Sequence, residues 1–200
     1  MTNRQKRAIK TKKNIYNAAI SLMQKQGIQQ TTIEEICKKS KVSVGSFYNY
    51  FKSKYDVLQA IYESADTYFE DTVAGELKNL NDKDKIIEFF RHYALYNKEN
   101  GLDFTKHLYF NSENKLFLAP NRYMHTLLRN ILEETQADNS INTGLSLDEV
   151  SELLFLIARG IVCDWCLHDG GYDLEQKTVL YFETILAQLY TRPASFHQNT

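Results

Sequence analysis

The stretch Thr32–Lys54, TIEEICKKSKVSVGSFYNYFKSK, predicts two short helices joined by a tight turn. Ile33, Ile36 and Cys37 recur at i, i+3 and i+4, which is the spacing of one apolar helix face. Thr32 is placed to cap this first helix, with a glutamate three residues later. Two short helices separated by about three to four residues have the geometry of a helix-turn-helix.

The second of these helices should run through Val44–Phe51, with Ser43 as its cap. Val44, Phe47 and Phe51 could bury one side of it, and the opposite side would then carry Gly45, Ser46, Tyr48, Asn49 and Tyr50. A glycine inside so short a helix costs about 1 kcal/mol relative to alanine. Close approach of the backbone to a ligand such as a DNA strand is the usual reason for it. The alternative is a surface helix hairpin with a few exposed tyrosines.

The same residues resemble the DNA-binding domain of TetR-family transcriptional regulators. The match lies in the Val42-Ser43-x-Gly45 turn, the Phe47-Tyr48-x-Tyr50-Phe51 run and Lys52-Ser53-Lys54, and it covers about the first sixty residues. It implies an all-α protein with a helix-turn-helix DNA-binding domain at 1–53. A helical ligand-binding and dimerisation domain would follow at 54–200, joined through a helix that begins near Lys54. The family positions that touch DNA match Thr32, Ser43, Val44, Gly45, Ser46, Tyr48, Asn49, Tyr50 and Lys54.

Charge is segregated along the chain. Residues 1–55 hold twelve Lys or Arg and two Glu, a net charge of +10, whereas the remainder holds twelve basic and twenty-three acidic residues, a net charge of −11. Residues 1–13 alone carry six basic side chains and no acid, as expected of an arm that neutralises phosphates. This asymmetry predicts that double-stranded operator DNA binds the first part of the chain.

The composition favours helices, because two prolines and eight glycines leave few turns in 200 residues. No stretch approaches the length of a membrane span and no apolar signal segment follows the basic N-terminus, so we expect a cytoplasmic protein without membrane contact. Hydrolase triads, phosphate-binding loops and HExxH are absent, so the sequence suggests no enzyme, no cofactor and no metal site.

Two long apolar helices are predicted at Leu147–Leu167 and Leu174–Tyr190. Their apolar faces are too wide for one small core, so a homodimer through about 147–190, built as a four-helix bundle, is the simplest way to bury them. The TetR resemblance implies the same C-terminal dimer.

Aromatic and histidine side chains gather between residues 89 and 123. They could line a pocket for a small-molecule effector of unknown identity. An aromatic stripe at helical spacing can equally be plain core. The candidate pocket residues are His92, Tyr93, Tyr96, Phe104, His107, Phe110, Tyr123 and Arg159. Arg159 could instead pair with Glu152 or Asp164.

Cys163 and Cys166, followed by His168, form the one constellation that suggests redox or metal chemistry. They lie near the predicted end of a helix, whereas reactive thiols favour a helix N-terminus. The sequence therefore predicts a sequence-specific DNA-binding transcriptional regulator, a repressor released by a small-molecule effector. The alternatives are a regulator cued by a protein partner or by oxidation of Cys163 and Cys166, and then a helical thiol oxidoreductase.

Overall fold

The computed structural model describes the chain except residues 1, 111–116, 118–121, 138–143 and 190–200, and except the side chains of 59–63. Every element among the described residues is helical, which confirms the all-α prediction. None of these helices is long and apolar enough to cross a bilayer. The chain divides into two compact units, one made of Met1–Ser64 with Asp103–Asn111 and the other of Ala65–Leu102 with Ser112–Thr200.

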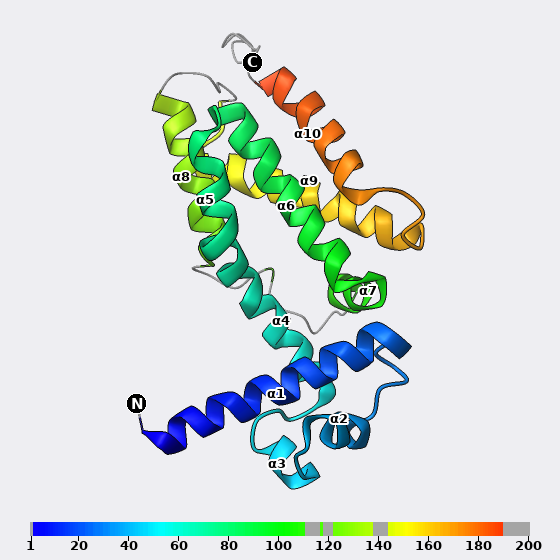
Figure 1. The fold of residues 1–200 in the computed structure, drawn as a ribbon. Helices are drawn as coiled ribbons and strands as arrows, with labels where there is room; N and C mark the ends of the chain where they lie inside the picture. The colour runs from blue at the N-terminus through cyan, green and yellow to red at the C-terminus, as the bar shows by residue number, and fades with distance from the viewer. Residues whose placement is uncertain (1, 111–116, 118–121, 138–143, 190–200) are drawn as a thin grey trace, which may run out of the picture. The chain divides into compact units, whose positions relative to one another are not determined.

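The first unit contains α1 (Asn3–Gln26), α2 (Ile33–Ser40), α3 (Val44–Tyr48), the start of α4 (Lys54–Tyr68) and most of α7 (Leu102–Phe110) (Figure 1). The basic arm is helical, because α1 begins directly after Thr2, whose side chain caps it. Ile15, Ala19, Ile36 and Phe47 are fully buried and form the centre of this unit. The spacing of Ile9 with Tyr16, Ile20 and Met23 predicts that Ile9 lies on the apolar face of the first helix, but its side chain is 56% exposed.

Apolar spacing from Leu58 to Leu80 predicts a long helix after Lys54, with Gly75 as the point where it ends or bends, but the helix geometry already changes after Tyr68. A π-helical turn at Phe69–Val73 leads into α5 (Ala74–Glu76) and a 3-10 turn at Leu77–Asn79. The polar break at residues 79–84 offers Asp82 as a candidate cap for the next helix, but the side chain of Asn81 caps it, and α6 spans Asp82–Asn100.

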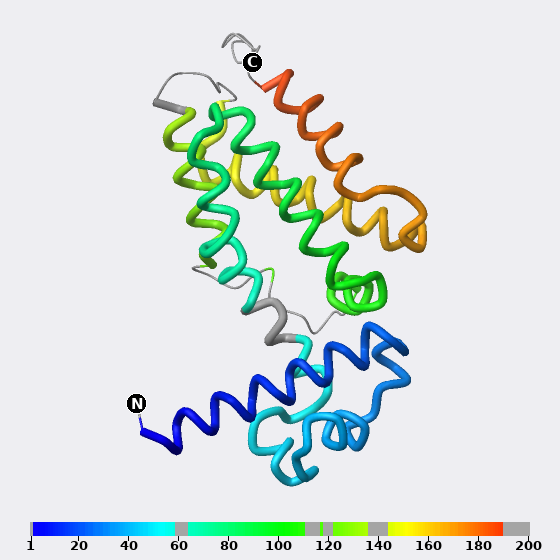
Figure 2. Tube along the Cα trace, viewed as in Figure 1, coloured from blue at the N-terminus to red at the C-terminus, as the bar shows by residue number. Residues whose placement is uncertain are grey.

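The second unit also contains α8 (Tyr123–Ala137), α9 (Leu147–Leu167) and α10 (Leu174–Leu189). The sequence predicts a helix at Tyr123–Leu132 after a loop at 111–121 that contains Pro120. Helix α8 is longer than this prediction, and the loop lies almost wholly outside the described residues. Helices α6 and α10 pack side by side (Figure 2). Their contact is aromatic, because the fully buried rings of Phe90 and Phe182 stack with centroids 4.1 Å apart.

Candidate nucleic-acid interface

The helix-turn-helix forms through local hydrogen bonds that the sequence pattern predicts. Thr32 and Glu35 make a reciprocal capping box at the start of α2, and the Thr32 backbone N–H lowers the pKa of the Glu35 carboxyl. Lys41 ends α2 in the left-handed conformation, with φ 58°. Ser43 then caps α3 by accepting a hydrogen bond of 3.1 Å from the Ser46 backbone N–H. Both predicted caps are confirmed.

Helix α3 ends at Tyr48, three residues before the predicted Phe51. It presents an uncharged face whose members Ser43, Val44, Gly45, Tyr48 and Asn49 are exposed, while Ser46 and Tyr50 are half-buried. Phe47 and Phe51 are buried as expected, but Val44 is 40% exposed and does not join them. The Val44 methyl groups are thus available to a ligand.

Gly45 has no packing role inside the protein. A Cβ atom built on it would meet no atom within 4 Å, and its φ lies outside the left-handed region. Neither sterics nor backbone strain within the fold therefore requires a glycine here. The hypothesis from the sequence is that the absence of a side chain at Gly45 lets a ligand come close to the backbone of α3.

Lys54 is held by the protein itself. Its ammonium donates to the carbonyl oxygens of Ile28, Gln29 and Thr31 at 2.8, 3.1 and 3.0 Å. An ammonium has three donors, and three carbonyls accept from this one. Lys54 thereby joins the start of α4 to the turn between α1 and α2, so its internal role is to fix the helix-turn-helix in place.

The surface of α1 supplies positive charge in the same unit. Its first turn carries no acidic residue, and the basic side chains on its first half are exposed, namely Arg4, Lys6, Arg7, Lys10, Lys12 and Lys13. Such side chains can neutralise phosphates without reading bases.

The eight candidate pocket residues do not form one group. Phe104, His107 and Phe110 lie on α7 and belong to the first unit, where His107 stacks on Tyr55 with ring centroids 4.7 Å apart. Burial, and then the charge of Lys54, lowers the pKa of His107. Phe110 is 53% exposed.

The other five candidates lie in the second unit, in different surroundings. His92 contacts Tyr68 and Glu76, and the Tyr96 ring lies 5.4 Å from that of Tyr68. Tyr93 packs edge-on to the ring of Phe155, and Tyr123 begins α8. The Arg159 guanidinium lies over the Phe117 ring, 5.8 Å from its centroid.

A polar group that the sequence pattern did not reveal lies at the start of α8. Arg122, 8% exposed, donates from Nε to Asp66 Oδ2 at 3.1 Å, and the other oxygen of Asp66 accepts from the Met124 backbone N–H at 3.3 Å. Asp66 on α4 thus caps the N-terminus of α8. No sequence signal could have shown this pairing, because 56 residues separate the partners.

His125 lies beside this pair, stacked on Phe155 with ring centroids 4.3 Å apart. Burial lowers its pKa, and the positive charges of Arg122 and Arg159 lower it further. Two arginines therefore lie near an imidazole that stacks on an aromatic ring within the second unit. This arrangement suits an anionic molecule with an apolar part.

The cysteines show no sign of activation. Burial raises the pKa of the Cys163 thiol, although Arg159 opposes the shift, and Cys166 is buried. Both lie in the C-terminal part of α9, where the helix dipole does not favour a thiolate.

A capped helix-turn-helix with an exposed, acid-free second helix, a basic first helix and a separate helical domain defines a helix-turn-helix DNA-binding protein. Residues 15–61 match the family described as bacterial regulatory proteins, tetR family. The chain belongs to the TetR family of transcriptional regulators, and its relatives are regulators, not enzymes.

Similarity to individual relatives extends over nearly the whole chain. The fatty acid metabolism regulator protein of Bacillus subtilis is 23% identical over 185 residues, covering 89% of this chain and 95% of that protein. The crystal structure of Bacillus subtilis FadR in complex with stearoyl-CoA has a TM-score of 0.68 at 24% identity, covering 89% and 97% of the two chains. The structure of Thermus thermophilus FadR, a transcriptional repressor in complex with lauroyl-CoA, has a TM-score of 0.69 at 20% identity, covering 94% and 100%.

Proposed function

We propose that this protein is a homodimeric repressor that binds a near-palindromic operator and is released by a long-chain fatty acyl thioester of coenzyme A. The observation that carries the effector class is that Arg122 and Arg159 lie near His125, whose ring stacks on Phe155. An acyl-CoA combines several negative charges with a long apolar chain, so it needs cations next to an apolar interior. Relatives similar over most of this chain were crystallised with stearoyl-CoA and lauroyl-CoA.

On the DNA side, α3 would enter the major groove. Val44, Ser46 and Asn49 would contact base edges or a thymine methyl, and Tyr48 would bind a phosphate. Ser43, Gly45 and Tyr50 would let the backbone approach the duplex, and Thr32 would present the N-terminus of α2 to a phosphate. Lys54 would act as a positioning residue, because its ammonium already serves three carbonyls.

Asp66 supplies a route from effector to DNA. It lies on α4, the helix that begins at Lys54 after the helix-turn-helix, and it bonds both Arg122 and the N-terminus of α8. An anionic effector that engages Arg122 would compete with Asp66 for the guanidinium. Breaking that pair would loosen α4 from α8. A difference of a few kcal/mol between the two states of α4 would be enough coupling.

The dimer would form through α9 and α10. These helices expose large apolar side chains, among them Leu156 at 53%, Leu167 at 72%, Leu180 at 57% and Tyr181 at 41%. Leu180→Glu should convert the dimer to a monomer in analytical ultracentrifugation, whereas Lys83→Glu, at a half-buried position of α6, should not. A dimer unchanged by Leu180→Glu would contradict this interface.

The effector is tested on an operator selected from random DNA by the purified protein. Stearoyl-CoA should release the protein from this operator at lower concentration than coenzyme A or stearate alone, because only the thioester offers both chain and phosphates. Arg159→Ala should raise the concentration needed, whereas Arg129→Ala, which removes an exposed arginine paired with Glu133 and Asp148, should not. Undiminished binding with every acyl-CoA would refute this effector class. Release by an oxidant, abolished in Cys163→Ser, would favour the thiol-cued alternative.

A further inference from the structure

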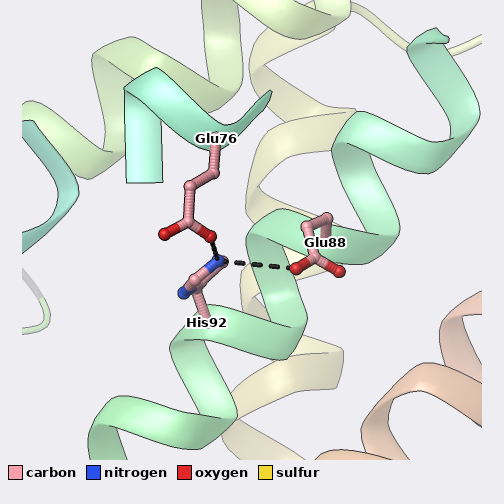
Figure 3. Close-up of side chains that lie close together, drawn as sticks. All are labelled: Glu76, Glu88 and His92. Atoms are coloured by element: carbon pink, nitrogen blue, oxygen red, sulfur yellow. Dashed lines mark hydrogen bonds and ion pairs between the residues drawn. The ribbon is translucent and has the colours of Figure 1, made fainter. Parts of the chain in front are cut away.

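Glu76, Glu88 and His92 bring one nitrogen and two carboxylate oxygens together in the second unit (Figure 3). Glu76 lies on α5, and Glu88 and His92 lie one turn apart on α6. One ligand atom from each side chain lies within 4.8 Å of the others. This cluster is separate from the Arg122, His125 and Arg159 group, and the proposed function does not use it.

The distances suit a metal ion. His92 Nε2 lies 3.0 Å from Glu76 Oε2 and 3.5 Å from Glu88 Oε1. Ligand atoms about 2.0–2.1 Å from a tetrahedral Zn²⁺ are separated from one another by about 3.3 Å, the edge of the tetrahedron. Two edges are therefore close to their final length without any ion, and a tetrahedral ion would take its fourth ligand from outside these three side chains.

The second nitrogen of His92 is held as metal-binding histidines require. Nδ1 lies 2.7 Å from the hydroxyl of Tyr68, and the His92 side chain is 4% exposed. If Nδ1–H donates to the Tyr68 oxygen, Nε2 carries the lone pair and faces the two carboxylates. A hydrogen bond at the outer nitrogen fixes the tautomer and the ring orientation of a ligating histidine.

Arg91 is the competing cation. Its Nη2 bonds Glu88 Oε1 and lies 3.3 Å from His92 Nε2, and this bond lowers the pKa of Glu88. A metal ion must displace the guanidinium from Glu88. Arg91 retains a partner in that event, because its Nη1 lies 3.2 Å from Glu175 Oε2 at the start of α10.

We propose that Glu76, Glu88 and His92 form a binding site for a divalent transition-metal ion of the zinc class, with Tyr68 as the outer hydrogen-bond partner of His92. One imidazole with two carboxylates matches Zn²⁺, Co²⁺ or Mn²⁺ better than Mg²⁺, which favours an all-oxygen shell. The ion can enter from solvent, because the Glu76 side chain is 53% exposed. Binding would tie α5, the segment that continues from α4 through the π-helical turn, to α6.

Cobalt titration of the full-length protein, stripped with EDTA and desalted, tests this site. We expect one Co²⁺ per chain, with visible absorption bands of low-symmetry nitrogen and oxygen coordination and without sulfur-to-cobalt charge transfer. Zn²⁺ should displace it and Mg²⁺ should not. Glu76→Gln should weaken binding by at least about tenfold. Glu70→Gln, which removes an exposed carboxylate from the neighbouring π-helical turn, should leave binding unchanged.

Three results would overturn the site. Binding that is equally tight in Glu76→Gln and Glu88→Gln would place the ion elsewhere, and charge-transfer bands would place it on Cys163 or another thiol. Absence of binding at millimolar Co²⁺ would mean that the three side chains form only a hydrogen-bonded cluster. Operator binding by the stripped protein, measured in parallel, keeps these results distinct from failure of the proposed function.

Discussion

Replacing Lys54 by alanine separates two roles that the same lysine could have. The substitution removes three charge-assisted hydrogen bonds, to the carbonyls of Ile28, Gln29 and Thr31. Such a bond contributes about 1.5–3 kcal/mol where water cannot replace it. One of the three lies in an exposed setting and the other two are partly buried, so we expect a net loss of about 2 kcal/mol. The melting temperature should then fall by roughly 4–8 °C for a chain of this length.

The DNA-binding assay for this variant measures affinity for operator and for random DNA at several salt concentrations. Because Lys54 acts through the turn between α1 and α2, both affinities should fall while the slope of log affinity against log salt stays unchanged. A lost phosphate contact would instead reduce the slope by about 0.9. Lys52→Ala, which removes an exposed neighbouring lysine, is the matched control and should leave stability unchanged. A smaller salt slope with undiminished stability in Lys54→Ala would refute the positioning role.

Three further predictions concern other parts of the chain. Gly45→Ala should leave the free energy of unfolding unchanged or raise it by up to about 1 kcal/mol, because the added methyl group meets no atom of the protein. The same methyl group should crowd the DNA and weaken operator binding roughly tenfold. Thermal melts measure the first effect and fluorescence anisotropy the second, and unchanged operator affinity would contradict close approach of DNA at this position. Phe182→Ala should lower the free energy of unfolding by about 3–5 kcal/mol in urea titrations, because it empties a fully buried site stacked on Phe90. Hydrogen bonding from Arg91 lowers the pKa of the Glu88 carboxyl in the folded protein. The ionised carboxylate therefore stabilises the fold above the unfolded carboxyl pKa of about 4.3, and this stabilisation is lost as pH falls through the pKa of the folded state. On acidification the free energy of unfolding of the wild type should drop more steeply than that of Glu88→Gln, and parallel curves would show that the Arg91–Glu88 pair contributes nothing.

The features that the sequence predicts correctly depend on neighbours in the chain. Thr32 and Ser43 cap α2 and α3 because a side-chain oxygen bonds a backbone N–H three residues away, a distance that the sequence shows directly. Apolar spacing likewise predicts the burial of Ile36 and Phe47. Val44 shares that spacing and is nevertheless exposed, because α3 is only five residues long and its first residue lies at the edge of the unit's core.

The interior of the second unit was less predictable, because its polar contacts join distant segments. His92 fits an aromatic pocket by composition, yet it contacts Glu76 from the segment before α6. The Asp66 contacts with Arg122 and Met124 cross 56 and 58 residues. Helical periodicity identifies the side of α4 that is buried, but not the helix that lies against it. Phe104, His107 and Phe110 show the same limit, since α7 belongs mostly to the first unit.

The sequence motif predicts a lysine that contributes to DNA binding at position 54, but it does not reveal the hydrogen bonds that this lysine makes inside the protein. A lysine at the start of α4 is consistent with a phosphate contact, and the sequence offers no means to see the three carbonyls of the preceding turn. Those carbonyls come from residues 23 to 26 positions earlier, so their convergence on one ammonium depends on how α1 and α2 pack. The same packing holds α3, through Phe47, on the core of the unit. Loss of Lys54 should therefore change DNA affinity by displacing α3, with no phosphate contact removed, and the salt slope distinguishes these two cases.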